Sequence, residues 1–316
     1  MTIDFTVVIP TYNSENRISL VLDKLKQQSF SKNIAWEIII IDNNSKDNTA
    51  QIIKNYQENW YQEYNLKYFK EEKQGAAFAR QKGIQEANSP LVGFLDDDNI
   101  PDASWVESAY DFAQKYPQAG AFGSLITGEF EVQPPPNFER IRPFLALTDR
   151  GNQALLYHPT LKYLPPSAGL VVRRKAWLET VPEKCILTGR VEGSMLTSED
   201  LEVLGYIQSK GWEIWYNPAM KITHKIPAHR LSREYLIPFI GGIGLSRYVT
   251  RMVGVKSYLK PILLLAYFLN DLRKILFQLL KYGMSVKTDL VAACEMELYI
   301  KSLISPFYLW YKGYLK

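Results

Sequence analysis

Three consecutive aspartates, Asp96, Asp97 and Asp98, are the residues of this 316-residue chain whose types and spacing most directly suggest chemistry. They follow the apolar run 91–95, which is typical of a buried strand, so their charges lie where that strand reaches the surface. In an extended chain Asp96 and Asp98 point to the same side, where their like charges would repel each other. A divalent cation removes that repulsion, and oxygen ligands favour Mg²⁺ or Mn²⁺, which typically bridge phosphates.

A plainer interpretation of the same residues stays open. The aspartates also fit a solvated acidic turn in which Asp98 or Asn99 caps a helix after Pro101. That interpretation does not explain why polar side chains also follow other predicted strands.

Alternating strands and helices must position these side chains. Apolar runs and helical spacing predict strands at 5–10, 36–41, 66–69 and 91–95, with helices around 18–25, 50–56 and 76–87. This order implies parallel strands joined by right-handed crossovers, and such sheets bind ligands outside the carboxyl ends of their strands. We therefore expect segments 11–13, 42–45 and 96–99 to converge on one crevice of an α/β fold with a mostly parallel, Rossmann-like central sheet.

The second half of the chain is less regular in pattern. A loop-rich stretch is expected between the prolines at 134–136 and those at 165–166. A helix is predicted at 199–209, with Thr197 or Ser198 as its cap and Gly211 as its stop, followed by a strand at 213–216.

Composition and charge exclude several classes of protein. With 47% hydrophobic and 22% charged residues, the chain fits a globular protein and not a disordered, collagen-like or disulfide-scaffold chain. A net charge of +4 is too small to indicate nucleic-acid binding.

Cys185 and Cys294 lie far apart without metal-ligand spacing, which favours a reducing cytosol. The N-terminus lacks the basic and apolar regions of a signal peptide and is interpreted as the first strand.

Four motifs in this order and spacing resemble the family 2 inverting glycosyltransferases of GT-A fold over residues 4–225. They are Pro10-Thr11-Tyr12-Asn13, the run 38–41 leading into Asp42-Asn43-Asn44-Ser45, the segment Gly75-Ala76-Ala77-Phe78-Ala79-Arg80, and Phe94-Leu95-Asp96-Asp97-Asp98. Segments 98–102 and 224–227 are similar to bacterial exopolysaccharide enzymes, including the hormogonium-polysaccharide type. The resemblance implies a catalytic domain over 1–227, with a nucleotide-sugar half at 1–100 and an acceptor half at 101–227. A helical extension occupies 228–316.

The resemblance also implies a role for individual residues. Asp42 lies where the family binds the base, usually uracil, while Asp98 and His224 match the site of a Mn²⁺ or Mg²⁺ ion on the diphosphate. Gln81 stands after Arg80 where the family has Asn. The implied nucleotide-binding set is Pro10, Thr11, Tyr12, Asn13, Asp42, Asn44, Arg80, Asp96 and Asp97. A lone histidine such as His224 is also commonly a structural residue.

The resemblance implies that Asp200 is the catalytic base. Its place in the first turn of a predicted helix favours the ionised form that accepts a proton, although Glu199 and Asp200 also fit simple stabilisation of the helix end. Gly169, Glu199 and Trp212 are expected on the acceptor side, where Trp212 could equally belong to the core. Arg230 and Arg233 fit either a diphosphate or a solvated surface.

The C-terminal segment from residue 258 is rich in apolar, aromatic and basic residues. Its longest apolar stretch, 262–269, is too short to span a bilayer, and Asn270, Asp271, Arg273 and Lys274 follow it. An interfacial pair of helices on the inner face of the cell membrane is expected. The alternative is a helical subdomain that packs on the catalytic domain or on a second subunit of a homo-oligomer.

The function expected from these residues is transfer of a sugar from a nucleotide-diphosphate donor, UDP-linked, to a saccharide or lipid-linked acceptor. The reaction would be metal-dependent and inverting, in cytoplasmic polysaccharide biosynthesis. A nucleotidylyltransferase is one alternative, but the loop after the first strand, 11–16, has neither the Gly nor the Lys that would hold a triphosphate. A catalytically silent membrane scaffold is the other, although it does not account for the presence of Asp98 and Asp200.

Overall fold

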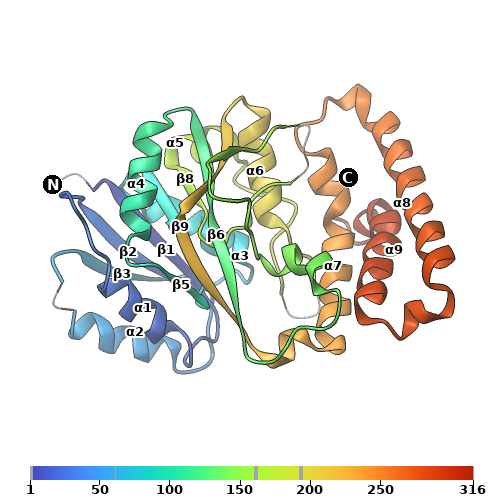
Figure 1. Cartoon of the computed structure of the whole chain (residues 1–316). Coiled ribbons are helices and arrows are strands. Elements are labelled where there is room, and N and C mark those ends of the chain that lie inside the picture. The colour runs from blue at the N-terminus through green and yellow to red at the C-terminus, as the bar shows by residue number, and fades with distance from the viewer. Residues whose placement is uncertain (1–2, 61, 160–162, 192–194, 316) are drawn as a thin grey trace. The chain divides into compact units, whose positions relative to one another are not determined.

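The computed structural model describes residues 3–60, 62–159, 163–191 and 195–315. The chain divides into two compact units (Figure 1). The first unit contains residues 1–129, 146–183 and 206–225, and the second contains 130–145, 184–205 and 226–316. The domain boundary at residue 227 that the sequence resemblance implies would place 130–145 and 184–205 in the catalytic domain. Their packing instead groups these two segments with the C-terminal helices.

The first unit is built on a mixed sheet with strand order β3-β2-β1-β4-β8-β6-β9-β5, and β7 pairs with β9. The strands β1 (Phe5–Thr11), β2 (Trp36–Asp42), β3 (Asn65–Lys70) and β4 (Leu91–Phe94) are parallel. The remaining strands are β5 (Asn99–Pro101), β6 (Ala119–Phe130), β7 (Leu155–Leu156), β8 (Val171–Arg173) and β9 (Glu213–Ile226). The predicted mostly parallel half is confirmed, and antiparallel pairs with β8 extend it beyond β4.

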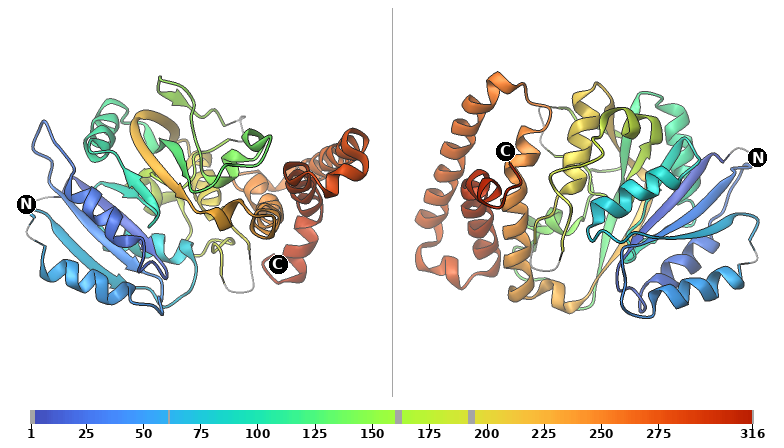
Figure 2. Two further views of the ribbon diagram at one scale, coloured as in Figure 1. Left: turned by 60° about the horizontal axis from the view of Figure 1, so that its bottom comes forward. Right: turned by 180° about the vertical axis from the view of Figure 1, so that it is seen from behind.

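Helices cover both faces of the parallel strands, which explains why β1 and β2 are almost wholly buried and why most of their residues are apolar. Figures 1 and 2 show α1 (Ile18–Lys26) and α2 (Thr49–Glu58) on one face and α3 (Ala76–Glu86) on the other. A Cβ built on Gly83 of α3 would lie 2.4 Å from Val8 Cγ1, so the absence of a side chain there lets α3 pack closely on β1. Further helices of this unit are α4 (Trp105–Lys115) and α5 (Arg174–Thr180).

One strand of the second half differs from the sequence-based expectation, and two other features agree with it. The prediction that a strand ends at residue 216 and a loop follows is wrong, because β9 continues to Ile226 and His224 therefore lies inside a strand. Where it is described, at 137–159 and 163–164, the stretch between the proline clusters is loop-rich as expected, with two short 3-10 turns and β7. The helix α6 (Glu199–Ser209) has the predicted bounds, and Gly211 follows it with a φ of +92°.

The second unit contains the helices α7 (Arg233–Met252), α8 (Lys260–Tyr282) and α9 (Leu290–Tyr311). α7 and α9 approach closely, since a Cβ on Gly244 would lie 2.7 Å from Lys301 Cβ and 2.8 Å from the Leu298 carbonyl oxygen. Ser305 accepts a hydrogen bond from the Tyr248 backbone N–H at 3.1 Å. Within the described part of the chain, none of the helices has the length and apolar character needed to cross a membrane.

Candidate active site

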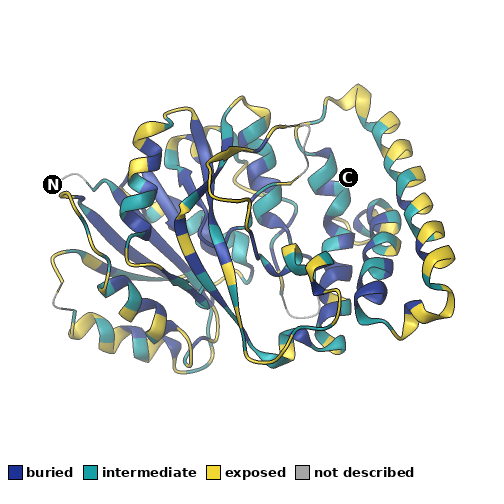
Figure 3. Ribbon diagram, viewed as in Figure 1, coloured by how far each residue is buried: buried dark blue, intermediate teal, exposed yellow. Residues whose placement is uncertain are grey.

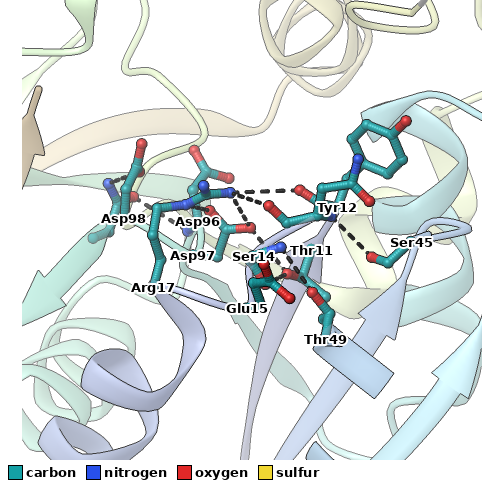
Figure 4. A network of polar contacts seen from close by, with 12 residues as sticks. Thr11, Tyr12, Ser14, Glu15, Arg17, Ser45, Thr49, Asp96, Asp97 and Asp98 are labelled. Atoms are coloured by element: carbon teal, nitrogen blue, oxygen red, sulfur yellow. Dashed lines mark hydrogen bonds and ion pairs between the residues drawn. The ribbon is translucent and has the colours of Figure 1, made fainter. Parts of the chain in front are cut away.

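Polar residues from three loops meet at the carboxyl ends of β1, β2 and β4. Thr11 is the last residue of β1, Asp42 is the last residue of β2, and Asp96 follows β4 by two positions. Because the three strands are parallel and adjacent, their ends lie along one edge of the sheet. Figure 4 shows Thr11 and Arg17 turned toward Asp97 at this edge, with Asp96 and Asp98 beside it. The predicted convergence of the segments that begin at Thr11, Asp42 and Asp96 is therefore found.

Asp97 lies at the centre of these contacts. Its Oδ2 accepts a hydrogen bond from Thr11 Oγ1 at 2.9 Å, and Arg17 reaches its two oxygens with Nε at 3.0 Å and Nη2 at 3.3 Å. Burial and the neighbouring Asp98 carboxylate raise the pKa of Asp97, although Arg17 and Thr11 act in the opposite direction. Asp97 was expected to contact nucleotide, and the structure gives it the additional task of joining two loops.

Arg17 is a site residue that the sequence analysis missed. Its Nη2 also donates to the carbonyl oxygens of Tyr12 at 3.4 Å and Asn13 at 3.2 Å. The same guanidinium therefore binds the loop after β1 and the aspartate loop after β4. Eighty positions separate Arg17 from Asp97, and the only local signal is a cation just before the first predicted helix.

Asp96 and Asp98 have different partners. The prediction of extended backbone through the aspartates is wrong, because β4 ends at Phe94 and a turn closes with a hydrogen bond from Asn99 N–H to the Asp96 carbonyl oxygen at 3.0 Å. Arg80 Nη2 of α3 lies 3.0 Å from Asp96 Oδ1. The pairing of these two predicted nucleotide contacts leaves about a third of the Asp96 side chain exposed, at 36%.

The register between β5 and β9 holds His224 beside Asp98. Asn99 is the partner of His224 in this antiparallel pair, and the Lys225 N–H donates to the Asp98 carbonyl oxygen at 3.2 Å. His224 Nε2 lies 3.4 Å from Asp98 Oδ2, and Asn99 Nδ2 donates to Asp98 Oδ1 at 3.0 Å. The two residues predicted as metal ligands are thus adjacent.

Asp98 and His224 are the residues on which a divalent ion could be held. In the residues that the structure describes, no group of three or more His, Cys, Asp or Glu side chains is close enough to hold a metal. Asp98 and His224 offer one carboxylate and one imidazole. Mg²⁺ and Mn²⁺ accept few protein ligands when substrate phosphates and water complete the shell. The pair therefore fits an ion that is held mainly by a diphosphate.

Asp42 is fixed by its neighbours. Tyr68 Oη donates to its Oδ2 at 2.8 Å and the Ser45 N–H donates to its Oδ1 at 2.8 Å. Burial, followed by this bond to Asp42, raises the pKa of Tyr68. Asn43, which the sequence analysis did not single out, accepts from the Gly75 N–H at 2.7 Å and so fixes the start of α3.

The loops after β1 and β2 are joined by Asn13. Its N–H donates to Ser45 Oγ at 2.9 Å, and its Oδ1 accepts from the Lys46 N–H at 2.9 Å. Asn13 and Asn44 have φ values of +47° and +67°, which asparagine tolerates better than most residues. Pro10 and Tyr12 flank Thr11, and the Tyr12 side chain is exposed.

The acceptor-side candidates of the first unit are explained by packing. Gly169 has a φ of +65°, its carbonyl oxygen accepts from Ser124 Oγ at 2.7 Å, and a Cβ there would lie 2.1 Å from Ile222 Cδ1. Trp212 lies against Gly120, whose added Cβ would meet Trp212 Cβ at 2.6 Å. The sugar contacts assigned to Gly169 and Trp212 stay predictions.

Glu199 and Asp200 begin α6 and belong to the second unit. Asp200 Oδ1 accepts from the Leu201 N–H at 2.8 Å, and the Glu199 side chain is buried. Both carboxylates stand in the first turn of α6, as predicted, where the helix end favours their ionised forms. The assignment of Asp200 as catalytic base, and of Glu199 to the acceptor side, stays a prediction.

Known proteins share both sequence and fold with this chain. The minor teichoic acid biosynthesis protein GgaA of Bacillus subtilis is 37% identical over 112 residues, which are 34% of this chain and 24% of that protein. Glycosyltransferase AglE of Haloferax volcanii is 31% identical over 103 residues, 32% of this chain and 33% of that protein. These alignments span a third or less of either relative.

Two solved structures cover nearly the whole chain. Staphylococcus aureus TarS 1-349 in complex with UDP-GlcNAc has a TM-score of 0.52 at 16% identity, covering 98% of this chain and 92% of that chain. The mannosyltransferase PcManGT of Pyrobaculum calidifontis, in complex with GDP-Man and Mn²⁺, has a TM-score of 0.58 at 15% identity, covering 95% and 86%. At these identities the likeness concerns the fold, and it confirms the predicted GT-A class. A family profile described as glycosyl transferase family 2 matches residues 6–174, more than half of the chain, and the chain therefore belongs to that family.

Proposed function

We propose that this protein is a glycosyltransferase that moves a sugar from a nucleoside diphosphate, UDP, to a hydroxyl group of a saccharide or lipid-linked acceptor. The observation that carries the proposal is the convergence of Thr11, Asp42 and the three aspartates 96–98 on one edge of the sheet. Family membership and the nucleotide-sugar complexes of TarS and PcManGT support it. We place the reaction in the cytoplasm, at the inner face of the cell membrane, in polysaccharide biosynthesis.

The donor half of the site must accommodate a doubly charged leaving group. Asp98 and His224 would hold a Mn²⁺ or Mg²⁺ ion, which supplies charge stabilisation for the departing diphosphate when bound. The Asp42 carboxylate, which is held by Tyr68 and Ser45, would contact the uracil base of the nucleotide. Arg80, held at Asp96, adds a nearby cation that is more than nine-tenths buried.

The acceptor half must remove a proton. Inversion requires a base on the side of the sugar opposite the leaving group. We assign this role to Asp200, because the N-terminus of α6 favours its ionised form, and a carboxylate can take the acceptor hydroxyl proton as the new glycosidic bond forms.

Two conservative substitutions separate binding from transfer. Asp98→Asn should weaken metal-dependent UDP binding, whereas Asp200→Asn should bind UDP normally and lose transfer by about 100-fold or more, the usual contribution of a general base. Calorimetry with UDP and Mn²⁺, followed by a transfer assay with a panel of nucleotide sugars, measures both. Glu58→Gln, an exposed carboxylate of α2, is the matched control.

The alternatives give different results in the same assays. A silent scaffold would show no metal-dependent UDP binding, and a nucleotidylyltransferase would bind a nucleoside triphosphate and release pyrophosphate. Undiminished transfer by Asp200→Asn would contradict its role as base.

A further inference from the structure

The helix α8 has its polarity reversed relative to an ordinary surface helix. Its two buried side chains are Asp271 and Gln278, which are 1% and 4% exposed. Six of its large apolar side chains are between 53% and 86% exposed: Ile262, Leu265, Leu269, Leu276, Phe277 and Leu280. Figure 3 shows this helix as largely exposed along its length. A helix in water normally buries the apolar side and shows the polar one.

The exposed apolar residues lie on one side of the helix. Asp271 comes nine residues after Ile262, which is about two and a half helical turns, so the two point in opposite directions. Leu269, Leu276 and Leu280 recur at intervals of seven and four residues and share the side of Ile262. We call these six side chains the apolar face of α8.

Polar contacts hold the opposite side of α8 against the rest of the second unit. Arg251 of α7 binds Asp271 with both terminal nitrogens, with Nη2 2.8 Å from Oδ1. Gln278 Nε2 donates to Glu295 Oε2 at 3.0 Å and to the Ala292 carbonyl oxygen at 3.2 Å. Arg140 also donates to the hydroxyl of Tyr282, the last residue of α8, at 2.7 Å. These directional bonds fix which side of the helix faces outward.

Charge identifies what covers this face. Between residues 251 and 288 the chain has seven basic residues and one acidic residue, Asp271, which is already paired. Lys281 and Lys287 are exposed beside and after the apolar face, and Tyr258 precedes it at 69% exposure. Arg273 lies within the face by helical spacing, and its guanidinium donates to Asn270 Oδ1 at 3.1 Å. A second copy of this chain would bring the same basic surface against itself, whereas anionic lipid headgroups would neutralise it.

We infer that the apolar face of α8 binds the surface of an anionic phospholipid bilayer, with the helix lying in the plane of the membrane. Asp271, Arg273 and Lys274 near the middle of the helix exclude a spanning arrangement, since charges at a bilayer centre are costly. Leucine and phenylalanine side chains would enter the headgroup boundary while the cations stay at the phosphates. This inference does not depend on the sugar-transfer chemistry.

Flotation of the full-length protein with vesicles tests the inference. The protein should float with phosphatidylcholine vesicles that contain phosphatidylglycerol, and much less with phosphatidylcholine alone. The triple variant Leu269→Ser, Leu276→Ser, Phe277→Ser should lower the vesicle-bound fraction at least about tenfold, because three large apolar side chains lose their burial. Arg273→Gln, Lys281→Gln, Lys287→Gln should abolish the preference for anionic vesicles and reduce the salt dependence of binding.

A matched triple variant provides the control. Val132, Leu155 and Leu178 are 45%, 39% and 50% exposed, and their change to serine should leave vesicle binding intact. Each variant is first checked for an unchanged circular dichroism spectrum. Binding that is unaffected by the α8 triple variant would overturn the inference. So would a protein that ignores vesicles and sediments as a dimer that the same variant dissociates, since a second copy would then cover the face.

Discussion

Arg17 is the residue that joins the loop after β1 to the aspartate loop. It binds both oxygens of Asp97 and the carbonyl oxygens of Tyr12 and Asn13 in the loop after β1. Its removal leaves the Thr11–Asp97 hydrogen bond as the remaining contact of Asp97 with that loop, without removing any residue expected to touch nucleotide. Arg17→Gln should therefore weaken UDP binding by about tenfold, in the range for a partly exposed charge-assisted pair. The UDP affinity of Arg17→Lys should lie between those of the wild type and Arg17→Gln, because lysine keeps the positive charge but cannot bind a carboxylate through two nitrogens.

Calorimetric titration with UDP measures this effect. Arg142→Gln removes another partly exposed arginine, which pairs with the exposed Glu139, and should leave the affinity unchanged. An Arg17→Gln protein with wild-type affinity would show that the loops keep their places without the guanidinium.

Asp97 gives a pH-dependent prediction at the same scale. Its pKa is raised in the folded protein, so the folded state binds its proton more readily than the unfolded state. The stability it contributes is complete below the ordinary carboxyl pKa and is lost as pH rises through the raised value. Asp97→Asn lacks this loss, so the free energy of unfolding of the variant should gain on that of the wild type between about pH 4 and pH 7.

Urea unfolding at several pH values within that range measures the difference. If the wild type instead became more stable relative to Asp97→Asn as pH rises, pairing with Arg17 would outweigh burial and the pKa of Asp97 would be lowered.

Among the elements, the turn at Gly169 packs so tightly that a methyl group should disturb it. Gly169→Ala would combine a φ of +65° with a Cβ only 2.1 Å from Ile222 Cδ1 and 2.6 Å from Ser124 Oγ. Strain and overpacking together should lower the free energy of unfolding by about 2–4 kcal/mol. Gly151→Ala, where φ is +86° and nothing lies within 4 Å of the added Cβ, should cost only about 1 kcal/mol.

Thermal unfolding of the two variants separates strain from crowding. Equal losses would show that the site around Gly169 has room to relax, and that its glycine is needed for backbone conformation alone.

The elements that the sequence predicted well are those defined by local pattern. Apolar runs located β1, β2 and β4, and helical spacing located α6 to the residue. β9 was cut short because Pro218, a residue that usually interrupts a central strand, stands just after the predicted end. Beside this proline, Asn217 Oδ1 accepts a hydrogen bond from the Ala219 N–H at 3.1 Å. Arg17 escaped detection for another reason, because its partner lies far away in sequence.

At the scale of the whole molecule, the second unit is assembled from three separate stretches of chain. Leu187 and Leu196 from the middle of the chain pack with Val249 of α7 and Leu309 of α9 in one hydrophobic cluster. Arg140 and Glu295 form an ion pair within the same unit. A domain boundary drawn at residue 227 would divide this core, which periodicity alone could not reveal.

Truncation after residue 227 should consequently damage the protein that remains. The fragment would expose Leu187 and Leu196, so we expect increased binding of a hydrophobic dye and aggregation on size-exclusion chromatography. The α8 triple variant should stay monodisperse, because its side chains are already exposed. A soluble, monodisperse 1–227 fragment would contradict this view of the second unit.

The pairing of Asn99 with His224 has a consequence for how β9 can change over generations. Because side chains along a strand alternate between its two faces, losing one residue after the β7 pairing and before His224 would present Lys225 to Asp98 instead of the imidazole, and gaining one would present Thr223. Point replacements there alter only one side chain at a time. The number of residues in this segment is therefore more strictly constrained than the identity of most of them.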